Sequence, residues 1–138
     1  MIKMKKLLFL LIGIFLCNLC MAQMEGYYQI LGKGRDGKVA CGGYISIKKS
    51  SRTCYLISIY IDDIQNKSWE TLDKKIVDER TVSFPTPDFT QKDEHGLPTW
   101  YDIVVQKCNV NPNVYYFVLP KLYGGKGTEI YKTQKYRG

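Results

Sequence analysis

Residues 44–61, YISIKKSSRTCYLISIYI, decide the expected fold of this chain. Two runs rich in tyrosine and isoleucine flank a short polar segment near Ser50 and Ser51, which is the pattern of a β-hairpin. In the second run, positions 55, 57, 59 and 61 are all tyrosine or isoleucine and therefore share one face of a strand. Because neither face of that run carries a charge, we predict that it is a central strand of its sheet.

Further runs of aromatic and β-branched residues, separated by turn residues, extend this pattern along the chain. The predicted strands are 27–31, 39–48, 54–61, 81–84, 100–107, 114–119 and 128–132. The segment NVNPN at 109–113 joins two of these runs and predicts a second hairpin. We therefore expect an all-β fold, a small antiparallel barrel or sandwich of about seven or eight strands.

The segment SWETLDKKIV at 68–77 departs from the strand pattern. Trp69, Leu72 and Ile76 have helical spacing, and Ser68 is a suitable N-cap, so a short helix and a strand are both consistent with the sequence.

The N-terminus has the composition of a secretory signal peptide at 1–22. Three lysines precede an apolar run at 7–17, whose 11 residues are fewer than the roughly 20 that a membrane-spanning helix needs. Cleavage after Ala22 leaves a single β-rich domain at 23–138, located in the periplasm or outside the cell. A lipid-modified Cys17 or Cys20 is the alternative, but each follows a leucine where such processing favours a small residue.

Cleavage lowers the formal net charge from +7 to +4, because it removes Lys3, Lys5 and Lys6. The remaining charges are interspersed, which is typical of a solvated surface. Together with export, this charge argues against a nucleic-acid partner, and no transmembrane span is expected in the mature chain.

Cleavage also leaves three cysteines, Cys41, Cys54 and Cys108, in a compartment that permits disulfides. Cys41 and Cys54 lie too far apart in the predicted hairpin to be bridged unless Gly42 and Gly43 fold the chain back. If 74–84 is a hairpin, Cys108 lies near Cys54; if it is a helix and a strand, Cys108 lies near Cys41. We predict the Cys54–Cys108 disulfide and one unpaired thiol.

Motifs that suggest catalysis or cofactor binding lack the context they need. The glycines at 32, 34 and 37 match a dinucleotide-binding pattern, but a strand and not a helix is expected to follow them. The stretch 85–98 is long for a connection and is a candidate binding loop. It contains His95, the only histidine in the chain, for which no nucleophile is evident. Asp88, Asp93 and Glu94 of this stretch, together with Asp62 and Asp63, would suit calcium, but their spacing matches no known calcium loop. We predict no catalytic residue, no metal and no cofactor.

Aromatic residues are the remaining candidates for ligand binding, since exposed tyrosine and tryptophan stack on sugars and anchor protein interfaces. The candidates are Trp69, Trp100, Tyr101, Tyr115 and Tyr116, for all of which packing in the sheet is the alternative role.

These observations favour a small exported, non-catalytic binding domain. The first hypothesis is a protein-interaction module of the inhibitor or immunity type. The second is a barrel or sandwich that binds a glycan or an apolar ligand through aromatic residues. The third is a hydrolase that uses His95. The sequence resembles no family that would decide among them.

Overall fold

The computed structural model describes residues 24–62, 64–122 and 127–136, and within these ranges it contains strands and no helix. The strands are β1 (Gly26–Lys33), β2 (Gly43–Ser51), β3 (Cys54–Ile61), β4 (Ile64–Leu72), β5 (Lys75–Asp78), β6 (Thr81–Lys92), β7 (Pro98–Lys107), β8 (Val114–Pro120) and β9 (Thr128–Lys135). The predicted signal peptide at 1–22 lies outside the described residues.

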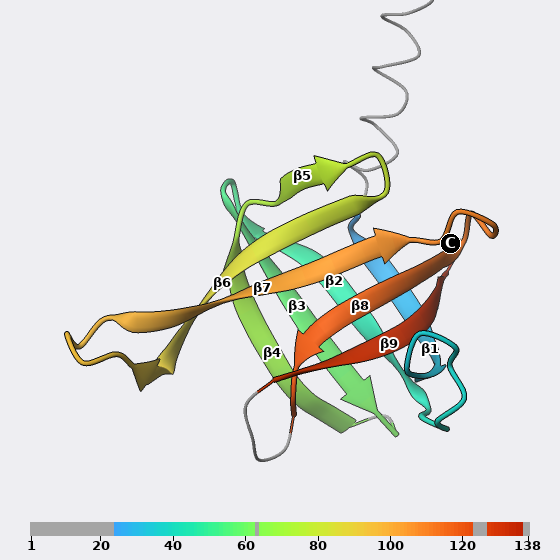
Figure 1. The fold of residues 1–138 in the computed structure, drawn as a ribbon, viewed down its shortest axis with the longest axis horizontal. Helices are drawn as coiled ribbons and strands as arrows, with labels where there is room; N and C mark the ends of the chain where they lie inside the picture. The colour runs from blue at the N-terminus through green and yellow to red at the C-terminus, as the bar shows by residue number, and fades with distance from the viewer. Residues whose placement is uncertain (1–23, 63, 123–126, 137–138) are drawn as a thin grey trace, which may run out of the picture.

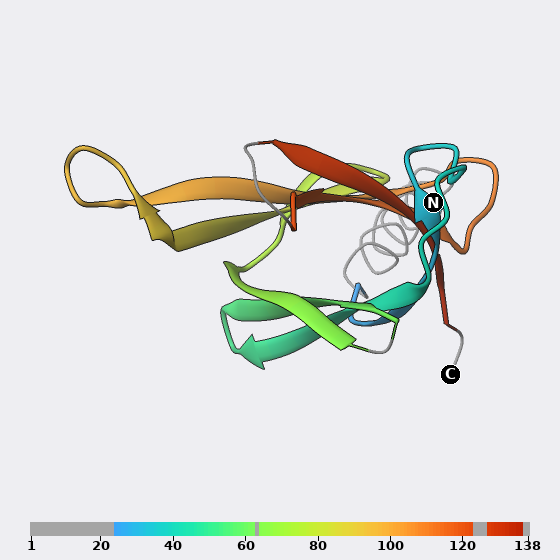
Figure 2. The ribbon, with the colours of Figure 1, turned by 90° about the horizontal axis from the view of Figure 1, so that it is seen from below.

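All nine strands form one antiparallel sheet in the order β4-β3-β2-β1-β9-β8-β7-β6-β5. The sheet curls into a half-barrel, and β4 near one edge packs against β6 near the other (Figure 1, Figure 2). The all-β prediction is therefore confirmed. Within the described part of the chain, no helix has the length and apolarity that a membrane span requires.

The core fills the concave side of the curled sheet, because alternate residues of each strand point inward. In β1 the buried positions are Tyr28, Ile30 and Gly32, and in β3 they include Tyr55, Ile57 and Ile59, as the alternation predicts. The fully buried side chains from the other half of the sheet include Phe84, Ile103, Phe117, Leu119 and Tyr131. Edge-to-face ring contacts join the two halves, with Tyr55 against Phe84 at 5.4 Å and Tyr28 against Phe117 at 4.9 Å between ring centroids.

The segment 68–77 forms strands, so the alternative of a short helix there is wrong. Trp69 and Thr71 are buried while Glu70 and Leu72 are exposed, which is the two-residue period of a strand. Pairing with β3 decides this outcome: Ile57 faces Trp69, and Ser58 faces Ser68 with their hydroxyl oxygens 2.8 Å apart. Ile76 lies in β5 with half of its surface exposed.

The stretch 85–98 is mostly regular, which corrects its interpretation as a long irregular loop. β6 continues to Lys92 and β7 begins at Pro98, so the connection between them is short. Pro85 pairs with Asp102 and Pro87 with Trp100 in register. A strand tolerates prolines where their missing N–H groups face an edge. The edge here is free because the pairing of β5 with β6 ends at Ser83.

The three described cysteines are free thiols, so the predicted Cys54–Cys108 disulfide is absent from the structure. The hairpin on which that prediction depended is present as β5 and β6, but the sheet order places β2, β1, β9 and β8 between β3 and β7. Cys54 begins β3 and contacts Thr53, whereas Cys108 follows β7 and contacts Tyr116.

Gly43 is a position where only glycine fits, and its replacement provides a test of the β2–β3 register. Its φ of +136° is unfavourable for other residues, and a Cβ atom would lie 1.9 Å from the carbonyl oxygen of Tyr60. Gly43→Ala is expected to lower the free energy of unfolding by about 2 kcal/mol, through backbone strain and displacement of β3. Urea denaturation measures this loss. An unchanged unfolding midpoint would contradict the close approach, and Gly96→Ala, where a Cβ meets nothing within 4 Å, controls for strain alone.

Candidate functional site

The distal part of the β6–β7 hairpin projects beyond the half-barrel as an arm, which we define as residues 85–101 (Figure 1, Figure 2). Three large apolar side chains of the arm are open to solvent: Phe89 is 70% exposed, Leu97 60% and Trp100 56%. Soluble proteins seldom leave neighbouring large apolar groups uncovered unless the surface has a binding role.

The register of the arm determines which way its side chains point. Phe84 pairs with Ile103, and both are buried in the core. The pair formed by Pro87 and Trp100 lies an odd number of residues farther along the hairpin, so it faces the opposite side of the sheet. Trp100 is therefore directed away from the core by the strand alternation.

The tip of the arm is a compact turn closed by Asp93. Its carboxylate accepts hydrogen bonds from the backbone N–H groups of His95 at 2.8 Å and Leu97 at 2.9 Å. The backbone N–H of Gly96 donates to the Asp93 carbonyl, and Gly96 has a φ of +75°. These bonds fix the backbone that carries Leu97, so this side chain is presented on an ordered turn. The side chain of His95 is exposed there.

The five aromatic residues proposed as ligand-binding do not form one site. Trp69 and Tyr115 are only 7% and 6% exposed and belong to the core. Trp100 and Tyr101 are neighbours on the arm but face opposite sides of the strand, and the Tyr101 hydroxyl donates to Gln91 at 3.1 Å. Tyr116 lies on the convex face of β8 beside Cys108. Of the five, Trp100 is the exposed side chain.

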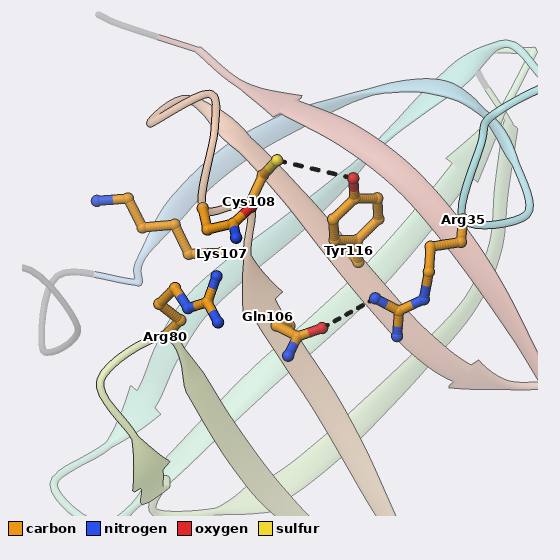
Figure 3. A pocket seen from close by; sticks show the side chains of 7 residues that line it. Arg35, Arg80, Gln106, Lys107, Cys108 and Tyr116 are labelled. Carbon is orange, nitrogen blue, oxygen red and sulfur yellow. Dashed lines mark hydrogen bonds between the residues drawn. The ribbon is translucent and has the colours of Figure 1, made fainter.

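A polar pocket of about 270 Å³ lies at the opposite end of β6 and β7 from the arm. It is lined by Arg35, Arg80, Gln106, Lys107, Cys108, Asn109 and Tyr116 (Figure 3). The Arg35 guanidinium stacks on the Tyr116 ring at 5.3 Å from its centroid and donates to the Gln106 side-chain oxygen at 3.1 Å. The pocket thus combines positive charge, an amide and a thiol.

The cysteines at this pocket and elsewhere have different electrostatic environments. Hydrogen bonds from the backbone N–H groups of Asn111 and Val110 lower the pKa of Cys108, and Tyr116 and the positive charge of Lys132 act in the same direction. Burial raises the pKa of Cys41. A low thiol pKa increases the thiolate fraction and so the reactivity of a cysteine.

A row of tyrosines on the outer face of β1, β2 and β3 was not identified from the sequence. Tyr44 stacks on Tyr60 with ring centroids 4.5 Å apart, and Tyr27 meets the edge of Tyr44 at 5.9 Å. The signal was present in the strand alternation, since these residues lie on the face opposite the buried isoleucines. Because Tyr44 and Tyr60 cover each other's faces, this row offers less open ring surface for a sugar than isolated tyrosines would.

No group of three or more histidine, cysteine or acidic side chains among the described residues is placed to hold a metal ion. Asp63, one of the acids considered for calcium, lies outside the described residues.

Comparison with protein-family models, curated proteins and solved structures found no match to this chain. The arm and the polar pocket are therefore the two surfaces from which a function can be inferred.

Proposed function

We propose that the chain is an exported, non-catalytic protein-interaction module, of the inhibitor or immunity type, that binds its partner through the arm. The observation that carries this proposal is the exposure of Phe89, Leu97 and Trp100 on one hairpin, which projects from the half-barrel (Figure 2). Aromatic anchors of this kind supply most of the energy in many protein interfaces when they enter a pocket of the partner. Export is supported by the composition of 1–22.

The mode of binding follows from the free edge of the arm. A strand edge normally recruits a partner strand through its N–H and C=O groups. Pro85 and Pro87 lie two residues apart, so both missing donors fall on the same edge of β6. This edge is a poor template for β-sheet extension, and we propose that recognition occurs by insertion of side chains into a concave apolar surface of the partner.

A protein partner accounts for these features better than a glycan. Sugar platforms combine flat aromatic faces with hydrogen-bonding groups, whereas Phe89 and Leu97 offer purely apolar surface at the outer end of the arm. Two of the aromatic residues considered for a glycan site, Trp69 and Tyr115, are enclosed in the core. The arm therefore has the apolar character of an interface hot spot.

The proposal is tested by capture of a partner from the envelope or extracellular fraction of the native source, with the mature chain immobilised. The double variant Phe89→Ser/Trp100→Ser is expected to retain the fold, because both side chains are exposed, and to capture at least about tenfold less of the partner. Val110→Ser is the matched control, since Val110 is 87% exposed on the β7–β8 turn, away from the arm.

A photo-crosslinking residue in place of Leu97 is expected to attach to the same protein. The proposal is wrong if the wild-type chain captures nothing, or if the double variant captures the same protein as strongly as the wild type and Val110→Ser. A partner lost with His95→Ala but retained by the double variant would instead direct attention to the histidine.

A further inference from the structure

The polar pocket is assembled from segments that are distant in the sequence. Arg35 comes from the β1–β2 connection, Arg80 from the turn before β6, and Gln106 and Cys108 from the end of β7. Arg35 and Arg80 enter from opposite sides with Gln106 between them (Figure 3). Two guanidinium groups around a shared polar cavity are suited to a carboxylate or a phosphate, because each has several N–H donors in a fixed plane.

The geometry of Arg35 is held in place before any ligand arrives. Its guanidinium lies over the Tyr116 ring and donates to Gln106, whose side-chain nitrogen donates in turn to the Thr81 hydroxyl at 3.4 Å. An arginine has five N–H donors, so these contacts leave others for a ligand. Prior ordering of the donors reduces the entropy lost on binding.

Arg80 is positioned by the backbone around it. Its carbonyl accepts the Lys107 N–H at 2.7 Å, which joins the β5–β6 turn to the end of β7. Asp78 closes that turn by accepting the Arg80 N–H at 2.8 Å, and its negative charge offsets part of the positive charge of Arg80. Glu79 is a second acid in the same turn. Among the described residues no carboxylate lines the pocket, and none of Arg35, Arg80 and Lys107 forms an ion pair.

We propose that this pocket is a binding site for a small anion that carries a carboxylate or phosphate group, held between Arg35 and Arg80. The site is separate from the arm, and it adds a second, small-molecule ligand to the proposed protein partner. Lys107 contributes to the positive potential, although its amino group extends away from Gln106 (Figure 3). The Cys108 thiol lines the site. A bound anion is therefore expected to change the rate at which this thiol is labelled.

The experiment uses Cys108 as the probe, with labelling at each cysteine resolved by mass spectrometry. The reagent is the dianionic disulfide dithiobis(nitrobenzoate): the Cys108 thiolate attacks one sulfur, a new S–S bond forms, and the original S–S bond breaks to release nitrothiobenzoate with the electron pair. Dicationic cystamine is the comparison reagent. We expect the rate ratio of the anionic to the cationic disulfide at Cys108 to fall about tenfold in Arg35→Gln/Arg80→Gln, and Cys41 and Cys54 serve as internal references.

Binding itself is measured by competition at constant ionic strength. Inorganic phosphate and citrate, which separate the phosphate from the carboxylate class, are each added against chloride, and at least one is expected to slow Cys108 labelling saturably. The same anion should shift the Gln106 side-chain amide signals in a nuclear magnetic resonance titration, and both effects should disappear in the double arginine variant. Arg52→Gln, on the β2–β3 turn, removes a charge far from the pocket and should behave as the wild type.

Two outcomes would overturn the proposal. One is the absence of saturable protection and of shifts with either anion. The other is equal protection in the wild type and the double arginine variant. Because both arginines are exposed, loss of folding is not expected to confuse the result, and the unfolding midpoint of the variant verifies this. Failure here leaves the arm proposal untouched, since the capture experiment does not involve the pocket.

Discussion

Replacing Phe117 with alanine is expected to lower the free energy of unfolding by about 4 kcal/mol. Phe117 is fully buried in β8, and its ring meets the edge of Tyr28 across the core. The loss combines the transfer free energy of the ring with the cavity that remains, because the surrounding strands are held by their ladders and relax only partly. Urea denaturation of the wild type and the variant at neutral pH measures the difference.

Trp100→Ala is the matched control for this measurement. It removes a larger aromatic side chain, but from the arm, where more than half of the side chain is exposed. We expect a change of less than about 0.5 kcal/mol. If Trp100→Ala destabilised the chain as much as Phe117→Ala, Trp100 would be part of the folding core and the case for a binding role of the arm would fail.

The contrast between these two residues shows how the structure separates stability from recognition. The curled sheet buries the rings of Tyr28, Phe84 and Phe117 on its concave side, and the arm extends two of its strands beyond that core. Residues on the arm can therefore change with little cost to folding. An interface on such an extension does not have to contribute to folding, because the core already stabilises the scaffold.

Much of the sheet was predictable because the signals that specify it are local. The alternation from Tyr55 to Ile61 indicates the buried face of β3 directly. All seven predicted strands are present, the strand at 54–61 with its predicted boundaries and the other six with changed ones. The second hairpin, joined at 109–113, is also present, with Gln106 facing Tyr116. A period of two residues is a property of the strand itself, so a sequence reveals it without knowledge of the partners.

The errors arose where distant partners decide the structure. Trp69, Leu72 and Ile76 have helical spacing, but pairing with β3 overrides that preference and turns Leu72 outward. The prolines of the arm suggested an irregular loop, because the free edge that accommodates them depends on where β5 ends. The predicted disulfide required Cys54 and Cys108 to lie close together, whereas the sheet order separates β3 from β7.

The candidate sites show the same division. The sequence identified Trp100 but ranked it with Trp69, because composition does not tell which tryptophan faces the core. Arg35, Arg80 and Cys108 lie in separate segments of the chain, and only the order of the strands in the sheet brings them to one pocket. Convergence of this kind requires long-range topology, which local patterns do not contain.

Stability at alkaline pH is expected to depend on Tyr28. Burial and, to a smaller extent, the neighbouring Tyr115 raise the pKa of Tyr28 well above its ordinary value. The hydroxyl donates to the Met24 carbonyl inside the core, so the folded state favours the protonated form. In the unfolded chain the same side chain ionises near pH 10. Above that pH the unfolded state binds fewer protons than the folded state, and ionisation therefore draws the equilibrium toward unfolding.

The stabilisation is thus fully present below about pH 10 and decreases by about 1.4 kcal/mol for each further pH unit, or roughly 3 kcal/mol by pH 12. Tyr28→Phe cannot ionise, so its free energy of unfolding should be lower than that of the wild type at pH 8, by about 1 kcal/mol for the lost hydrogen bond. It should then decline less steeply between pH 10 and 12, and the two curves should approach or cross. Trp100→Ala, which removes no ionisable group, should run parallel to the wild type. Parallel curves for Tyr28→Phe and the wild type would mean that water reaches the Tyr28 hydroxyl, and that the concave side of the sheet is less closed than its burial indicates.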